Sequence, residues 1–456
     1  MKPFRPLRPA ALCLLLSLGP WAGSHAQSLL DAAQSTLAHD AGWQAQALAV
    51  DAASHRQAQG RALLLPQIGL QASTQHSDST VRAAVPLVGD VRTTQPSWQR
   101  SAGVELTQPL YRPANLAQYR QGQQGLALTQ AQQAAAQQKL LLQVAQAYLA
   151  ALQAQDVLNV VSTLRQAVTE QSTLAQRNFD VGLVTVTDVR EAQARLDMVQ
   201  AQWLAASNDV ALQTLALQKL TTWTTPQPWV LPASASLPAT SAEEVQAWLA
   251  ELPAAHPLLQ QTATARAIAE LEVKKAQAGH LPTVDLQASY GQQRNPDGSM
   301  TLPMPHRITA GTVGVKLQLP LFAGFAVQNR LRETLSLAAK AQAEQEDAQR
   351  NVELAVRQAF LGWQSAQEQS TALAAAVVSS TTALQATQTG YQVGVRINAD
   401  VLAAQVQAAN AEKDWLRARY QVLLAYLQLR QAAGRLNLDD IAQVSALFTP
   451  VAPAGK

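Results

Sequence analysis

The chain contains two similar halves, and this repetition constrains its fold more than any other feature. FDVGLVTVTDVREAQ at 179–193 returns as YQVGVRINADVLAAQ at 391–405, displaced by 212 residues. ALLLPQIGLQAS at 62–73 returns as AGHLPTVDLQAS at 278–289, and the order of the repeated motifs is preserved. A unit of about 200 residues is too long for a solenoid repeat of roughly 20–45 residues. We therefore expect a tandem duplication in which both halves fold on one plan.

The motif positions also predict the division of the chain. The first structural repeat is assigned to residues 27–240 and includes the proline-rich linker 226–238, and the second repeat is assigned to 241–447. A short tail, 448–456, follows. Each repeat should begin with helical sequence, 28–62 in the first half and 241–278 in the second.

Residues 1–26 have the composition of a secretory signal peptide. Three basic residues precede the short apolar stretch ALCLLLSLGPW, and Ser24-His25-Ala26 has the pattern of a cleavage site. Without this segment the chain has 31 basic and 31 acidic residues, so its charge does not indicate a nucleic acid partner. The only cysteine, Cys13, lies in the signal, and the exported protein would therefore have no disulfide and no cysteine-bound metal.

Each half contains two segments in which apolar and polar residues alternate, the pattern of a strand with one apolar and one polar face. The four segments are 67–73, 103–107, 283–290 and 312–319. Strands of about ten residues can cross a bilayer in a tilted barrel. Residues 75–99 and 291–308 are rich in turn formers, and we expect them to be exposed loops of two hairpins.

Long helices are predicted between and after the strands. Residues 114–178 contain no proline, and 325–389 repeat this pattern. Each hinge is followed by apolar residues spaced by seven, which is typical of a coiled-coil seam. These rows are Val189, Leu196, Trp203, Val210 and Leu217 in the first half and Val401, Ala408, Trp415, Val422 and Leu429 in the second. We interpret Trp203 and Trp415 as packing residues of these seams.

The strands and helices together predict an α+β membrane protein. No segment after the signal has 18 uninterrupted apolar residues, so a membrane would have to be crossed by strands. Four strands alone would leave open edges in lipid. Three copies would supply twelve strands, four per chain, and the same symmetry would arrange the long helices into a tube.

The repeated hinges carry a resemblance to a known family. Val-Gly and Asp-Val recur at one spacing in RNFDVGLVTVTDV (177–189) and GYQVGVRINADV (390–401). With the signal and the duplicated plan, they resemble the TolC family of outer membrane factors. The resemblance implies a homotrimer in the outer membrane of a Gram-negative bacterium. Its twelve-stranded outer membrane β-barrel, four strands per chain, would be continued by an α-helical coiled-coil barrel in the periplasm. It would be a channel-tunnel, the exit duct of type I secretion or tripartite efflux. A periplasmic adaptor (a membrane fusion protein) and an inner-membrane ABC or proton-driven transporter would dock at its inner end.

The hinges also contain the candidate functional residues. Gly182 and Gly394 would permit the backbone turns. Asp188 and Asp400 lie where the next helices should begin, an end that favours carboxylates for structural reasons alone.

The resemblance implies more specific roles for the hinge residues. Tyr391 and Arg396 would bond Thr187 and Asp188 and form a latch that holds the periplasmic mouth shut. No partner is assigned to Asp400, and its three copies would form an acidic ring in the lumen. Well-known members have a second acid where this chain has Ala403, which predicts weaker cation binding here.

The sequence argues against an enzyme and leaves one alternative to a channel. No nucleophile elbow, phosphate loop or paired histidine motif is present, so we expect neither an enzyme, a cofactor nor a metal site. A periplasmic coiled-coil adaptor or a structural envelope protein without a channel would explain the heptads but not four matched strands. The cargo, a toxin or protease versus a small molecule, is left open by this sequence.

Overall fold

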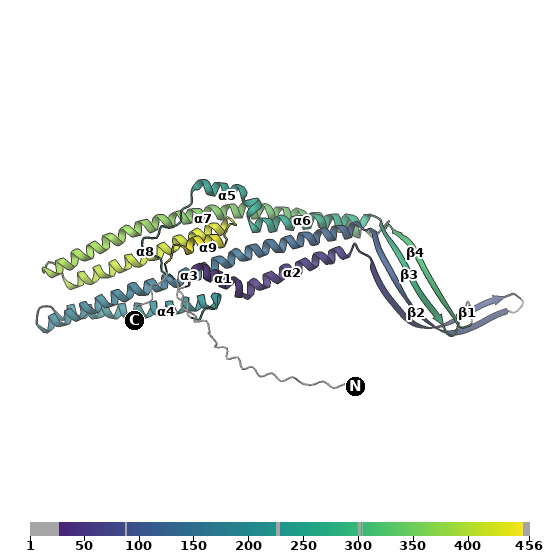
Figure 1. Ribbon diagram of the computed structural model, residues 1–456, viewed down its shortest axis with the longest axis horizontal. Helices are drawn as coiled ribbons and strands as arrows, with labels where there is room; N and C mark the ends of the chain where they lie inside the picture. The colour runs from purple at the N-terminus through teal and green to yellow at the C-terminus, as the bar shows by residue number, and fades with distance from the viewer. Residues whose placement is uncertain (1–26, 87–88, 225–228, 300–301, 303, 450–456) are drawn as a thin grey trace, which may run out of the picture.

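The computed structural model describes residues 27–86, 89–224, 229–299, 302 and 304–449. The predicted signal, part of the linker and the end of the tail lie outside these residues. The protein is elongated, with a long helical body and a curved sheet at one end (Figure 1).

The two halves have the same order of elements. The first half contains α1 (Leu29–His39), α2 (Ala41–Ala62), β1 (Gln67–Val85), β2 (Gly89–Tyr111), α3 (Pro113–Asp180) and α4 (Val186–Thr221). The second half contains α5 (Ala242–Ala255), α6 (Pro257–Gln277), β3 (Thr283–Asn295), β4 (His306–Gln318), α7 (Ala326–Gln392) and α8 (Asn398–Ala432), followed by α9 (Leu438–Ser445).

The expected helix 28–62 is divided into α1 and α2. Asp40 has an extended backbone between them, and its carboxylate accepts a hydrogen bond of 2.7 Å from the Trp43 amide. The break has a counterpart in the second half, where His256, with an extended backbone, separates α5 from α6. An aspartate that caps the next helix therefore ends the helical run at a place where the apolar pattern gave no sign of a break.

The four strands form one antiparallel sheet in the order β1-β2-β3-β4. The central pair, β2 and β3, joins the two halves, with Leu106 opposite Ala288 and Gly103 opposite Gly291. The two glycines leave no room for side chains, since a Cβ on Gly103 would lie 2.9 Å from the Gly291 Cα. In the single chain β1 and β4 are the edges of the sheet.

The expected loop 75–99 is wrong, because most of it is strand. β1 and β2 have 19 and 23 residues rather than about ten, and their pairing continues to Val85 and Gly89. Within this extension the Thr80 and Thr94 hydroxyls bond across the hairpin at 3.0 Å. Pro96 is tolerated because β3 pairs with β2 only from Arg100 onward. The second expected loop also shortens, because β3 reaches Asn295 and β4 begins at His306.

The helical body consists of a row of helices from which two hairpins extend. α3 packs against both α2 and α6, and α6 packs against α7, which gives the order α2-α3-α6-α7. α3 continues into a hairpin with α4, and α7 continues into a hairpin with α8. Among the described residues, no helix has the length and apolar character needed to span a membrane.

The main core lies in the middle of the body, where α1, α3, α5, α8 and α9 meet. Fully buried side chains there include Leu29, Tyr148, Leu252, Leu423 and Ile441. Tyr148 meets Phe448 edge to face, with 5.9 Å between the ring centres. Farther out, the hairpins have a narrow seam of Val168, Ala192 and Val199. Burial of each large side chain contributes about 1.5–3 kcal/mol, so most apolar stabilisation is concentrated in the middle.

Candidate functional site

The two repeated hinges are the tips of the α3–α4 and α7–α8 hairpins, at the end of the molecule opposite the sheet (Figure 1). Gly182 and Gly394 have φ angles of +78° and +80°. Beyond them, the Leu183 amide bonds the Asn178 carbonyl at 2.8 Å, and the Val395 amide bonds the Gly390 carbonyl at 2.9 Å. In both turns, a glycine in the left-handed backbone conformation thus ends a long helix.

At the first hinge, Asp188 is held by the start of α4. Its Oδ2 accepts the Thr185 amide at 2.9 Å and the Thr185 hydroxyl at 2.7 Å, while the Asp188 amide donates to that hydroxyl. This reciprocal cap lowers the pKa of Asp188, chiefly through the hydroxyl bond. The Asp188 carboxylate is therefore a firmly ionised group at the tip.

At the second hinge, the equivalent aspartate is held less tightly. Ile397 occupies the place of Thr185 and has no hydroxyl, so among the described residues Asp400 accepts a single hydrogen bond, from the Ile397 amide at 3.5 Å. The Arg396 guanidinium lies 3.7 Å from the same carboxylate, and the two side chains are 60% and 42% exposed. The sequence analysis assigned no partner to Asp400, whereas in the single chain Arg396, in the turn two residues before α8 begins, forms this weak pair with it.

The candidate latch residues all lie at this end of the molecule. Thr187 is exposed near the start of α4, and Tyr391 is half-buried in the last turn of α7. Within the described part of one chain, no hydrogen bond or ion pair joins Thr187 or Asp188 to Tyr391 or Arg396. The latch stays a prediction, and in the single chain Arg396 faces Asp400.

The surroundings of Arg396 include a residue that the sequence analysis missed. A Cβ added to Gly390 would lie 2.9 Å from the Arg396 Cγ, so the arginine stem crosses directly over this glycine. The first hinge has Asn178 at the equivalent position and Val184 in place of the arginine. Only the second hinge combines a glycine and an arginine at these two positions. This difference between the two copies could have predicted the contact from the sequence.

Comparison with known proteins identifies the family. A family model described as "Outer membrane efflux protein" matches residues 32–222 and 248–435. The chain belongs to the outer membrane efflux protein family. It is 30% identical to the outer membrane protein TolC of Vibrio cholerae, over 98% of this chain and 98% of that protein. It is 29% identical to the proteases secretion protein PrtF of Dickeya chrysanthemi, over 97% of this chain and 96% of that one.

A solved structure has the same fold. The Campylobacter jejuni CmeC outer membrane channel matches with a TM-score of 0.76 over 98% of both chains, at 16% identity. The resemblance inferred from the hinges is confirmed, as is the expected outer membrane location. In the part of this family member that the structure describes, no group of three or more His, Cys, Asp or Glu residues is arranged to hold a metal.

A contact between the two hairpins was also missed by the sequence analysis. Asn398, the first residue of α8, is buried, and its Oδ1 accepts a hydrogen bond from Gln171 of α3. The Asn398 Nδ2 atom has no partner among the described residues. One turn later, Leu402 is 3% exposed and packs into the α3–α4 seam. In this family member, the second hairpin is therefore fastened to the first just behind the tips.

Proposed function

We propose that the protein is the outer membrane exit duct of a type I secretion or tripartite efflux system. It works as a homotrimer, in which three four-stranded sheets close a twelve-stranded barrel and the helical bodies form a tunnel. The observation that carries this proposal is the sheet with two unpaired edges at one end of a long helical body. In lipid, such edges must be paired, because each unpaired backbone group costs several kcal/mol.

The partners of the duct follow from its shape. The hairpin tips lie far from the sheet, so a sheet in the outer membrane places the tips in the periplasm (Figure 1). A periplasmic adaptor and an inner-membrane transporter, ABC type or proton-driven, dock at that end. One relative is named for protease secretion and the family for efflux, and both cargo classes remain candidates for this chain. A periplasmic adaptor without a channel is not favoured, because the family consists of outer membrane proteins.

The mouth of the tunnel is controlled by the hinge residues. Arg396 and Tyr391 of the second hinge bond Thr187 and Asp188 of the first and keep the mouth narrow. Three copies of Asp400 face the lumen and attract cations. Support comes from the position of all five residues at the tips and from the weak, exposed Arg396–Asp400 pair, which leaves the arginine available to another acid.

Planar lipid bilayers test the proposal. Purified protein should extract from outer membranes with detergent and produce discrete conductance steps in a bilayer. A protein recovered from the soluble periplasm that produces no steps would contradict the duct and favour the adaptor.

A further inference from the structure

The structure relates the two halves residue by residue. α6 begins 216 residues after α2, and the contact between Asn115 and Leu63 recurs as a contact between Val327 and Gly279, displaced by 212 and 216. Buried residues of α3 and α7 are also displaced by 212 in the sequence, as Leu140 and Val352 are. Numbering offsets of 216 for α2 and α6, and of 212 for α3 and α7, therefore identify equivalent positions.

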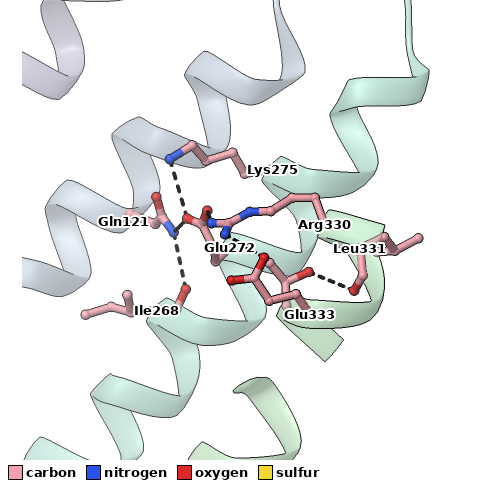
Figure 2. Close-up of polar contacts among 8 residues, drawn as sticks. Gln121, Ile268, Glu272, Lys275, Arg330, Leu331 and Glu333 are labelled. Atoms are coloured by element: carbon pink, nitrogen blue, oxygen red, sulfur yellow. Dashed lines mark hydrogen bonds and ion pairs between the residues drawn. The ribbon is translucent and has the colours of Figure 1, made fainter. Parts of the chain in front are cut away.

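The contact between the halves includes a polar cluster shown in Figure 2. Gln121 of α3 donates to the Glu272 carboxylate of α6 at 2.8 Å and to the Ile268 carbonyl at 3.3 Å. Glu272 also accepts hydrogen bonds from Arg330 of α7 at 2.8 Å and from Lys275 at 3.4 Å. Arg330 in turn bonds Glu333 at 3.0 Å, so the cluster runs across the row from α3 to α7.

At the outer flanks of the row, the equivalents of this central contact have opposite charges. Gln121 corresponds to Glu333 on α7, and Glu272 corresponds to Arg56 on α2. Glu333 and Arg56 are both exposed and lie at opposite ends of the row α2-α3-α6-α7. A second copy that continues the row would bring its Arg56 against Glu333, as α6 brings Glu272 against Gln121.

We propose that neighbouring copies meet through a repetition of the contact between the two halves, with Arg56 of one copy paired to Glu333 of the next. The same equivalence sets the strand register. VELTQPL at 104–110 returns as VKLQLPL at 315–321, which gives an offset of 211 for β2 and β4, and the repeated segments 62–73 and 278–289 give 216 for β1 and β3. The opposed pair Leu106–Ala288 of β2 and β3 therefore becomes Leu317 of β4 opposite Ala72 of the next copy's β1. Each copy thereby offers one flank to the copy before it and the other to the copy after it, the head-to-tail arrangement that closes a ring.

This inference rests on the proposed trimer, and cysteine pairs test the register separately. Cys13 is the only cysteine of the sequence, so introduced cysteines beyond the signal are unique. Ala72→Cys with Leu317→Cys, bridged by a short bis-maleimide, should give covalent trimers in a denaturing gel. Gln318→Cys in place of Leu317→Cys points to the other face and should give several-fold less product. Leu106→Cys with Ala288→Cys is the matched control within one chain.

The outcomes distinguish the two proposals. A trimer in native mass spectrometry that bridges better through position 318 than through 317, or through neither while the control pair reacts, would overturn the register. A monomeric protein would overturn the trimer itself.

Charge reversal tests the helical part of the contact. Arg56→Glu and Glu333→Arg should each lower the temperature at which the trimer dissociates, because each places like charges together. Glu333→Arg also loses the pair with Arg330 inside the chain, so the double reversal should recover the loss caused by Arg56→Glu but not this second part. Equal and additive losses, with no recovery in the double variant, would overturn the pairing of Arg56 with Glu333.

Discussion

Gly394 lies in the turn just after α7 and Gly362 lies in the middle of α7, and their replacement should have opposite effects. Gly394 has a φ of +80°, a conformation that costs other residues about 1–2 kcal/mol. Gly362 has open space around its Cβ position within an ordinary helix. Gly394→Ala should destabilise the hinge by about 1–2 kcal/mol, and Gly362→Ala should stabilise α7 by about 0.5–1 kcal/mol. Amide hydrogen exchange of α7 and the hinge measures both, and effects of equal sign would contradict this explanation.

Arg396 and Asp400 should have opposite effects on block of the tunnel by cations. Their weak pair partly neutralises Asp400, so Arg396→Ser should strengthen block by multivalent cations. Asp400→Ala should weaken it, because the carboxylate that attracts the ions is gone. Conductance titrated with a trivalent cation provides the measurement. Unchanged block in both variants would show that Asp400 does not bind cations and only stabilises the start of α8.

The latch predicts a second effect at the same residues. A guanidinium bonded to the ionised Asp188, with a tyrosine hydroxyl beside it, stabilises the closed mouth by about 1–3 kcal/mol per copy. Arg396→Ser with Tyr391→Phe should therefore raise single-channel conductance while the trimer stays intact. Arg177→Ser removes the same charge one turn before the first hinge and should leave conductance unchanged. Equal conductance in the double variant and the original protein would rule the latch out.

At the scale of the helix, the packing of α8 on the first hairpin holds the two tips together. Leu402 is the large apolar side chain that α8 places in the α3–α4 seam, and the Gln171–Asn398 hydrogen bond lies beside it. Leu402→Ala removes this packing, at a typical cost of about 2–5 kcal/mol. The hairpins should then separate more easily.

The expected result is a higher conductance, with faster hydrogen exchange at the start of α8. Leu183→Ala changes a leucine that is 74% exposed at the first tip and should alter neither quantity. A Leu402→Ala protein with normal exchange at α8 would show that this contact does not fasten the hairpins.

At the scale of the whole molecule, the sheet and the row of helices each end in two unpaired flanks, one from the first half and one from the second. β1 and α2 form one flank, and β4 and α7 form the other. Pairing them between copies satisfies the backbone groups of both edges without any change within the chain. Native mass spectrometry in mild detergent should therefore give three copies. A monomer, or a mixture of open-ended oligomers, would contradict the closed ring.

The sequence by itself determined which segments are strands, which are helices and where the long helices turn. These properties are local: alternation with period two, absence of proline over more than sixty residues and a glycine before a capping aspartate each act within a few neighbouring residues. The positions of α3, α7 and both hinges agree with the expected ranges to within a few residues for this reason. The same local logic placed Asp188 and Asp400 at helix starts.

Only the tertiary structure decided how far the strands extend and which side chains meet. Turn-forming residues in 75–99 remain in strands because the pairing of β1 with β2 continues to Val85 and Gly89, a cooperative effect between two segments to which the Thr80–Thr94 hydroxyl pair adds. Asn398 is buried because Gln171 and Leu402 lie on the face where two hairpins touch, although its place in the sequence suggests an exposed helix start. The junction of β2 with β3 likewise depends on two segments about 180 residues apart. Such contacts depend on the free energy of bringing distant elements together, which no local pattern records.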